Sequence, residues 1–229
     1  MEGLVLELQS EILNSNCDIL SILRKAHLMA SKLNLNEFDE WIIKELNGYK
    51  NYNDIPEYRE VTGVIKAHNP VHGLIEVLIP KSLSKDLNSM KLNFSISEII
   101  ELSRKNESIK MLLTAEISEL LCSEIGITFP CYFIFGVHCL LDIIEKVKNT
   151  ILQWCIDLGK AGIVGTNLKF NDNEIKKAKE VLQNNTYYIS QVFNGDIKSS
   201  NFSFNNILNN YEKNPNLQTG DRKHILFNI

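Results

Sequence analysis

The sequence lacks an excess of charge of either sign. Its 229 residues carry 24 basic and 28 acidic side chains, a net charge of −4. A protein that binds phosphate backbones generally carries a basic excess, so we do not expect general nucleic-acid binding. Glycine and proline are also scarce, at 11 and 5 residues, which excludes a fibrous repeat and wholesale disorder. The hydrophobic share of 44% and the length suit one large domain, or a domain with an appendage.

Cysteines are few and form no framework. There are five, an odd number, and most lie in apolar stretches, where a free thiol behaves as a small hydrophobe. The pair nearest to a CxxC motif, Cys131 and Cys139, is too widely spaced for a redox or zinc motif. The N-terminus has acidic residues at Glu2 and Glu7 where a secretory signal needs basic ones. We therefore expect a cytoplasmic protein.

A long hydrophobic segment of membrane-spanning length is also missing. The longest uncharged run covers residues 125–141, whereas a membrane helix needs roughly 20 predominantly apolar residues. Pro130 interrupts the run near its start, which predicts a buried strand at Cys131–Phe135 and a helix from about Val137. The favoured interpretation is a core element, and we expect no association with a membrane.

Most of the chain has the periodicity of amphipathic helices. Apolar residues recur at helical spacing in several segments, and capping residues stand at some of their ends. Asn36 and Gly48 are expected to begin and end the third helix, and Asn171 with Glu174 forms a capping box for the last. The predicted helices are 4–13, 18–33, 36–47, 107–123, about 137–158 and 171 to about 182, with a short one at Ser82–Ser89.

After Gly48 the residue pattern changes from helix-like to strand-like. Tyr58–Ala67 and Gly73–Ile79 are rich in β-branched residues and predict two strands around an Asn69-Pro70 turn. Phe94–Leu102 begins strand-like and is expected to become helical after Ser97. The fold class is therefore α+β and predominantly helical: an N-terminal helical segment, a small β-sheet, long C-terminal helices and a β-hairpin tail.

That tail, residues 184–229, is rich in asparagine and serine. Asn194-Gly195 lies between apolar-rich runs and predicts a tight hairpin turn. A two-stranded hairpin is marginally stable alone, so it must pack on the preceding domain, residues 1–183, or on another chain. We interpret it as an oligomerisation or partner-docking element, carried by Tyr187, Ile189, Val192, Phe193 and Ile197.

Motifs of established catalytic centres are absent. No phosphate-binding loop, dinucleotide fingerprint, nucleophile elbow or zinc-protease motif occurs in the sequence. His68 and His72 have the spacing of helical metal ligands, but Pro70 prevents a helix between them, so a solvated turn is favoured. We expect no metal and no cofactor, and the catalytic residues, if any, stay unknown.

One block combines residue types in an unusual way. It runs from Trp41 to Arg59, with a helix stop at Gly48 and several aromatic and charged side chains. The favoured interpretation is a helix-to-sheet corner locked by large side chains. The alternative is a ligand or partner surface formed by Glu45, Asn47, Tyr49, Glu57, Tyr58 and Arg59.

This block resembles the AbiTii domain of bacterial proteins linked to abortive infection and anti-phage conflict. The resemblance rests on the segments Ile22-Leu23-Arg24-Lys25-Ala26, Glu45-Leu46-Asn47-Gly48-Tyr49 and Pro56-Glu57-Tyr58-Arg59, with Phe38 and Trp41. It continues in the helix Ile143–Leu152 and in Gly162-Ile163-Val164-Gly165, Phe170 and Glu174, and covers about residues 1–183. Lys148 departs from the pattern, where arginine is expected. The resemblance implies a role in defence and brings no catalytic residues with it.

Three hypotheses follow. The leading one is an anti-phage protein of the abortive-infection type that acts through protein–protein contacts, with itself as a homo-oligomer or with another defence-system protein. The alternative is an effector enzyme or nucleotide-sensing module with a site near the Trp41–Arg59 block. A third, membrane disruption through residues 125–141, would require that run to be released on activation.

Overall fold

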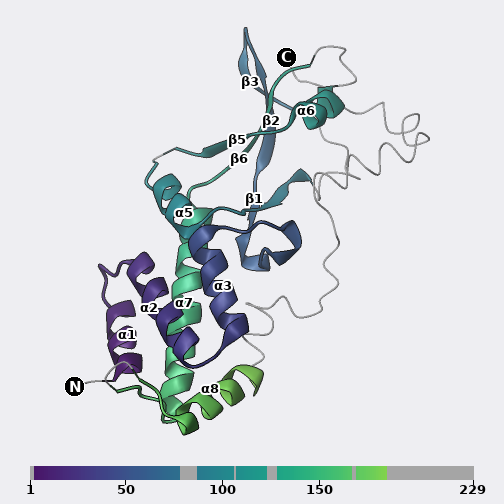
Figure 1. Ribbon diagram of the computed structural model, residues 1–229. Helices are drawn as coiled ribbons and strands as arrows, with labels where there is room; N and C mark the ends of the chain where they lie inside the picture. The colour runs from purple at the N-terminus through teal and green to yellow at the C-terminus, as the bar shows by residue number, and fades with distance from the viewer. Residues whose placement is uncertain (1–2, 78–86, 106, 123–127, 167–168, 185–229) are drawn as a thin grey trace. The chain divides into compact units, whose positions relative to one another are not determined.

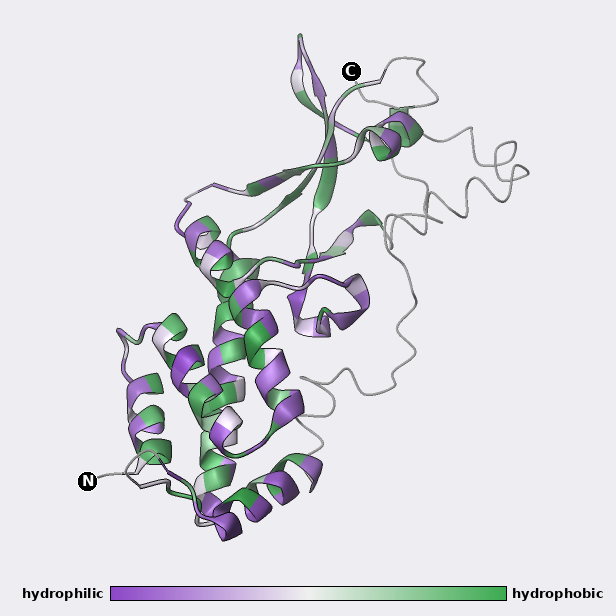
Figure 2. Cartoon of the chain, in the orientation of Figure 1, coloured by the Kyte–Doolittle hydropathy of each residue, from purple (hydrophilic) through white to green (hydrophobic). Residues whose placement is uncertain are grey.

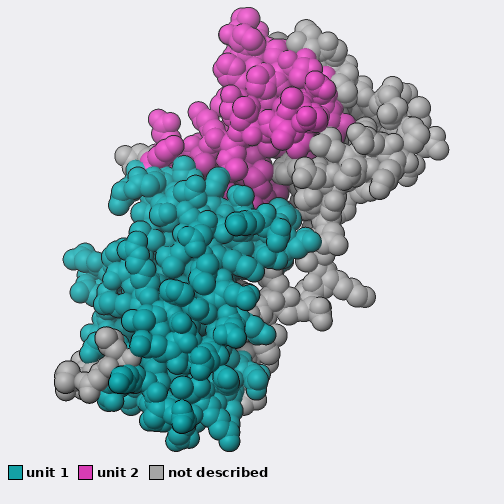
Figure 3. All heavy atoms as spheres, viewed as in Figure 1, with its two compact units in different colours: residues 1–59, 93–104, 140–197 teal, residues 60–92, 105–139, 198–229 magenta. Residues whose placement is uncertain are grey.

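The computed structural model describes residues 3–77, 87–105, 107–122, 128–166 and 169–184 (Figure 1). These residues form two compact units, which Figure 3 distinguishes by colour. The described part of unit 1 lies within residues 3–59, 93–104 and 140–184, and that of unit 2 within 60–92 and 105–139. The chain thus contributes to each unit more than once. The predicted boundary between 1–183 and 184–229 stays a prediction.

Unit 1 is built from helices, as the periodicity predicted. The first two confirm the helices expected over 4–13 and 18–33, and the carboxylate of Asp18 caps the second by accepting from the amides of Leu20 and Ser21. The helices are α1 (Leu4–Ile12), α2 (Ile19–Lys32), α3 (Asn36–Asn47), α5 (Ile96–Ser103), α7 (His138–Lys160) and α8 (Asp172–Asn184). Helix α7 contributes to unit 1 from Leu140 onward.

The core of unit 1 lies along α7. Val147, Ile151 and Trp154 recur on one face of this helix and are fully buried. Phe38 of α3 stacks at 4.6 Å between ring centroids on Trp154, and Gln9 of α1 donates to the carbonyl of Cys155 at 2.8 Å. In Figure 2 the hydrophobic colour accordingly recurs along α7 where α1–α3 surround it. Packing on α7 therefore fixes the helices that carry the candidate site.

The described residues of unit 2 form two antiparallel sheets. A small one pairs β1 (Glu60–Thr62) with β4 (Ser89–Lys91). The larger sheet consists of β2 (Val64–Asn69), β3 (Gly73–Glu76), β5 (Ile109–Leu112) and β6 (Cys131–Phe135). Its strand order is β3-β2-β6-β5, and helix α6 (Ala115–Cys122) contacts β6.

The β2–β3 hairpin confirms the predicted turn at Asn69-Pro70. Asn69 pairs with Gly73, and its side-chain oxygen accepts from the amides of Val71 and His72, which stabilises the turn. The first strand is shorter than expected, because Tyr58 and Arg59 belong to a 3-10 turn, η2 (Glu57–Arg59), and Gly63 separates β1 from β2.

Three predictions of helix ends and types are wrong. Residues 107–123 are not one helix: Ile109–Leu112 pairs with β6 as strand β5, because cross-strand bonds outweigh a helical pattern in so short a segment, and α6 follows. Asn36 does not cap α3, since buried Leu35 holds the capping position. Helix α5 begins at Ile96 with Ser95 as its cap, not after a strand-like start.

The uncharged run proved to be a core element where it is described. Cys131–Phe135 is the predicted strand, β6, and α7 begins at His138, close to the expected Val137. Among the helices that the structure describes, none has the length and apolar character to cross a membrane.

Two further predictions lie outside the described residues. Of the helix predicted at Ser82–Ser89, residues 82–86 are not described. Its last residue, Ser89, is the first residue of strand β4. The hairpin tail, with Tyr187, Ile189, Val192, Phe193 and Ile197, lies entirely outside the described residues.

Candidate functional site

The Trp41–Arg59 block forms a tight corner after helix α3. The helix ends at Gly48, whose φ of 84° lies in the region that favours glycine. A Cβ at Gly48 would lie 2.9 Å from the carbonyl oxygen of Asn93, so the close approach also requires glycine. The amide of Tyr49 then donates to the same carbonyl at 2.8 Å. This turn brings the residues after α3 back beside its last turns.

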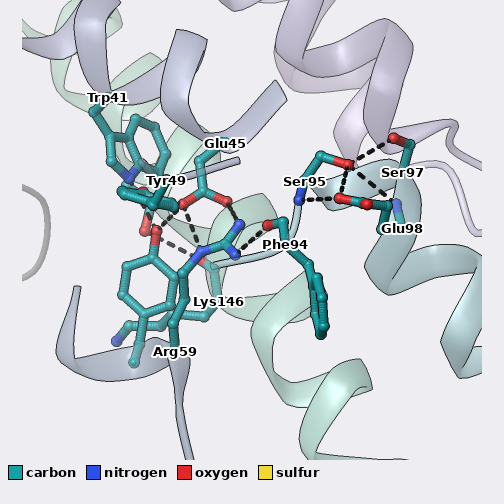
Figure 4. Close-up of polar contacts among 11 residues, drawn as sticks. Trp41, Glu45, Tyr49, Arg59, Phe94, Ser95, Ser97, Glu98 and Lys146 are labelled. Atoms are coloured by element: carbon teal, nitrogen blue, oxygen red, sulfur yellow. Dashed lines mark hydrogen bonds and ion pairs between the residues drawn. The ribbon is translucent and has the colours of Figure 1, made fainter. Parts of the chain in front are cut away.

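At this corner a single carboxylate, that of Glu45, gathers four donors (Figure 4). Its Oε1 accepts from the hydroxyl of Tyr49 at 2.5 Å, the hydroxyl of Tyr58 at 2.6 Å and Nε of Arg59 at 3.0 Å. Its Oε2 accepts from Nη2 of Arg59 at 2.5 Å. The indole Nε1 of Trp41 donates to the Tyr58 hydroxyl at 2.9 Å. We call these five residues the Glu45 cluster.

The ion pair at the centre of the cluster is completely buried. The side chains of Glu45 and Arg59 each have 0% exposure. Arg59 also donates from Nη1 to the carbonyl of Phe94 at 2.6 Å, and its guanidinium carbon lies 4.8 Å from the centre of the Tyr49 ring. A buried ion pair persists only when its remaining hydrogen-bonding groups find partners, and this one is tied to three chain segments. The Phe94 contact could not be expected from sequence, because any residue has a carbonyl.

Burial and the charges within the cluster move the pKa values of Tyr49, Tyr58 and Arg59 upward. Burial raises the pKa of Tyr49, and the neighbouring Glu45 carboxylate raises it further, so the phenol remains a neutral donor. The pKa of Tyr58 is raised by the same two causes. Burial is the largest influence on Arg59 and acts to lower its pKa, but the charge and hydrogen bonds of Glu45, together with Tyr58 and Tyr49, outweigh it and the net pKa is raised. The two phenols are therefore neutral hydroxyl donors, and the Arg59 guanidinium keeps its charge.

The structure brings together four of the six predicted site residues. Glu45, Tyr49, Tyr58 and Arg59 meet in the Glu45 cluster, with Trp41 as the fifth member. Asn47 does not join them: it is exposed, and its amide donates to the carbonyl of Ile43 one turn back on α3. Glu57 is also exposed, on η2. Glu45, Tyr49 and Arg59 are buried and Tyr58 is half-buried, which agrees with the favoured interpretation of this block as a locked corner.

A second carboxylate, that of Glu174, holds the loop that follows α7. Glu174 accepts from the amides of Val164 at 3.0 Å and Gly165 at 3.1 Å, and from that of Asn171 at 2.9 Å. The Asn171 side chain accepts in turn from the Glu174 amide, which confirms the predicted capping box. Although burial acts to raise the pKa of Glu174, these backbone donors outweigh it and the pKa is lowered.

The same loop holds the start of α1. The carbonyls of Gly165 and Val164 accept from the amides of Leu4 at 3.0 Å and Val5 at 3.2 Å. Gly165 has a φ of 66°, and a Cβ there would lie 2.5 Å from the ring of Phe170. The segment Gly162–Gly165, with Phe170 and Glu174, thus has a structural role. Its hydrogen bonds connect the N-terminal helix α1 to the C-terminal helix α8.

Other groups that carry chemistry do not converge on a site. His68 and His72 are exposed in and after β2, and no group of three metal-binding side chains occurs among the described residues. His27 contacts Asp39 across α2 and α3 at 2.5 Å, a pair that sequence analysis missed because nothing in the spacing signals it. The Cys131 Sγ lies 4.0 Å from that of Cys122, and the pKa of Cys131 is raised to about 12, first by burial and then by Cys122.

Comparison with known proteins confirms the family that the motifs suggested. The model of the AbiTii family matches residues 3–183, most of the chain. Searches of curated proteins and of solved structures give no match. The matched range contains the Glu45 cluster and the loop Gly162–Gly165, which Glu174 holds. At both places the structure gives a role to residues on which the resemblance to the family rests. The chain belongs to the AbiTii family.

Proposed function

We propose that this chain is an antiviral defence protein of the abortive-infection type that acts through protein–protein contacts and self-assembly. The observation that carries the proposal is the AbiTii match over residues 3–183, since the name of that family points to abortive infection. The 45 residues after α8 provide the assembly element, because they hold apolar residues in a hairpin-like sequence pattern. The proposal includes a cytoplasmic location and no catalytic centre.

The state of the Glu45 cluster supports contact over catalysis. A catalytic acid, base or nucleophile has to reach a substrate, and its pKa is usually tuned toward neutrality. Glu45 and Arg59 have no exposed surface, and the pKa values of Tyr49 and Tyr58 are moved away from neutrality. These features speak against the alternative of an effector enzyme or nucleotide sensor at this block.

Two changes to the C-terminal segment test the proposal. The first is a chain that ends at Asn184, the last residue of α8. The second keeps full length and replaces Tyr187, Ile189, Val192, Phe193 and Ile197 with serine. Light scattering should show a smaller mass in solution for both, and plaque counts in bacteria expressing them should show lost protection. Mass and protection that both stay at wild-type levels would contradict the proposal.

A further inference from the structure

The larger sheet of unit 2 has one buried face and one exposed face. On one side Ile65, Ala67, Cys131, Phe133 and Phe135 are at most 5% exposed. On the other side the register pairs Val64 with Ile134, and Leu112 with Tyr132. Because Tyr132 and Ile134 are two residues apart on β6, these four side chains form one contiguous apolar patch. We call Val64, Leu112, Tyr132 and Ile134 the open face.

Two of the four side chains of the open face are more than half exposed. Leu112 is 63% exposed and Val64 is 52% exposed, whereas Tyr132 and Ile134 are half-buried. Lys66 and Lys110 lie on the same side of the sheet at the edge of the patch, by the same register. An apolar patch rimmed by charged side chains is typical of an interaction site. The open face therefore needs an occupant that is apolar in its centre.

The chain itself contains a segment with the matching chemistry. Between Thr186 and Phe204 the sequence has only two charged residues, Asp196 and Lys198. Tyr187, Ile189 and Phe193 recur at even spacing, the pattern of a strand with one apolar face. Two antiparallel layers pack face to face at about 10 Å, so a hairpin and an open sheet face complete each other as a sandwich.

We infer that the open face of one copy binds residues 186–204 of a second copy. The segment begins two residues after the end of α8, and residues 185–204 can span roughly 70 Å when extended, so the segment is long enough to reach a second copy. Each copy has one face and one segment, so two copies exchange segments reciprocally and close a two-fold dimer. This inference rests on the proposed function, of which it names the contact surface.

Paired charge substitutions in the full chain test the inference. Val64→Glu with Leu112→Glu places two carboxylates on the open face, and neither change touches the buried side of the sheet. Val71→Glu is the matched control, because Val71 is 83% exposed at the tip of the β2–β3 turn and lies outside the patch. In sedimentation, we expect the double variant to weaken self-association at least about tenfold and the control to leave it within about twofold. Circular dichroism checks that both variants fold.

The outcomes separate the inference from the proposed function. If serine at the five tail positions lowers the mass but the open-face variant does not, assembly stands and the open face is not the docking site. If neither change lowers the mass, the assembly proposal itself fails. If only the open-face variant lowers it, the occupant is not the C-terminal segment, and the inference is overturned.

A photo-crosslinker at position 112 identifies the occupant directly. Full-length protein with benzoylphenylalanine at Leu112 is mixed with ¹⁵N-labelled protein and irradiated, and peptides are sequenced by mass spectrometry. We expect crosslinks from position 112 to peptides within 186–204, joining labelled to unlabelled chains. Crosslinks confined to chains of one isotope would show binding within a copy and overturn the inference, as would crosslinks to other segments. The same probe at Val71 should give none to the tail.

Discussion

The Glu45 cluster and the open face break the usual distribution of side chains in opposite ways. One buries an ion pair completely, and the other exposes aliphatic side chains by half or more. In the cluster the polar atoms are paired with one another and with a backbone carbonyl. On the open face the apolar side chains contact water, and their burial against another surface would be favourable. A buried charge with partners therefore indicates structure, whereas an exposed apolar patch indicates a contact still to be made.

The largest effect is expected from removing one half of the buried ion pair. Glu45→Ala leaves the Arg59 guanidinium buried without its carboxylate, and breaking such an ion pair costs about 3–5 kcal/mol of unfolding free energy. Urea denaturation monitored by circular dichroism measures this. The double variant Glu45→Leu with Arg59→Met, which removes both charges, should recover part of the loss, because the Tyr49 and Tyr58 hydroxyls still lose their acceptor. A loss of unfolding free energy below about 1 kcal/mol for Glu45→Ala would contradict the structural role that we assign to the cluster.

The two tyrosines of the cluster should differ in what their hydroxyls contribute. Each donates to Glu45, but the Tyr58 hydroxyl also accepts from the Trp41 indole. Tyr58→Phe therefore removes two hydrogen bonds and leaves the Trp41 indole without its acceptor, whereas Tyr49→Phe removes one. Tyr58→Phe should cost more than Tyr49→Phe, within the range of about 1.5–3 kcal/mol for hydrogen bonds to charged groups. Denaturation of both single variants and the double variant tests the order. Equal costs would show that the indole contact contributes nothing.

A smaller, pH-dependent effect is expected at the cap of α5. Ser95 and Glu98 form a capping box, and the hydrogen bonds from Ser95 lower the pKa of Glu98. Ser95→Ala should cost about 1 kcal/mol at neutral pH. A lowered carboxyl pKa stabilises above the unfolded value of about 4.3, and this contribution is lost as pH falls through the folded pKa. Stability curves of the two proteins should therefore converge in acid. A gap that stays constant down to pH 3 would contradict the assignment to Glu98.

The smallest effect on unfolding is expected at the open face. In dilute protein, where association is negligible, Leu112→Thr and Val64→Thr should change the unfolding free energy by no more than about 0.5 kcal/mol, because their surroundings are solvent. The matched change at the buried side, Ile65→Thr, should cost several times more, since Ile65 is 4% exposed. Equal losses at Leu112 and Ile65 would mean that the open face is already covered within one copy.

The family and the chain's helical framework followed from the sequence alone. Apolar periodicity located α1, α2 and α7. The Asn171–Glu174 capping box could be predicted because its two residues are only three positions apart in the sequence. The motif block from Trp41 to Arg59 also revealed the family, since several unlike residue types recur in order. Its favoured interpretation as a locked corner agrees with the burial of Glu45 and Arg59.

What only the tertiary structure decided depends on partners far away in the sequence. Residues 109–112 carry a helical pattern and became a strand because β6, some twenty residues later, supplies the hydrogen bonds. Likewise, spacing could not show that Arg59 bonds to the carbonyl of Phe94, or that Val64 and Leu112 share one side of a sheet. Local signals fix caps, turns and amphipathic faces. Strand register and the burial of a charge are decided by which distant segments the fold brings together.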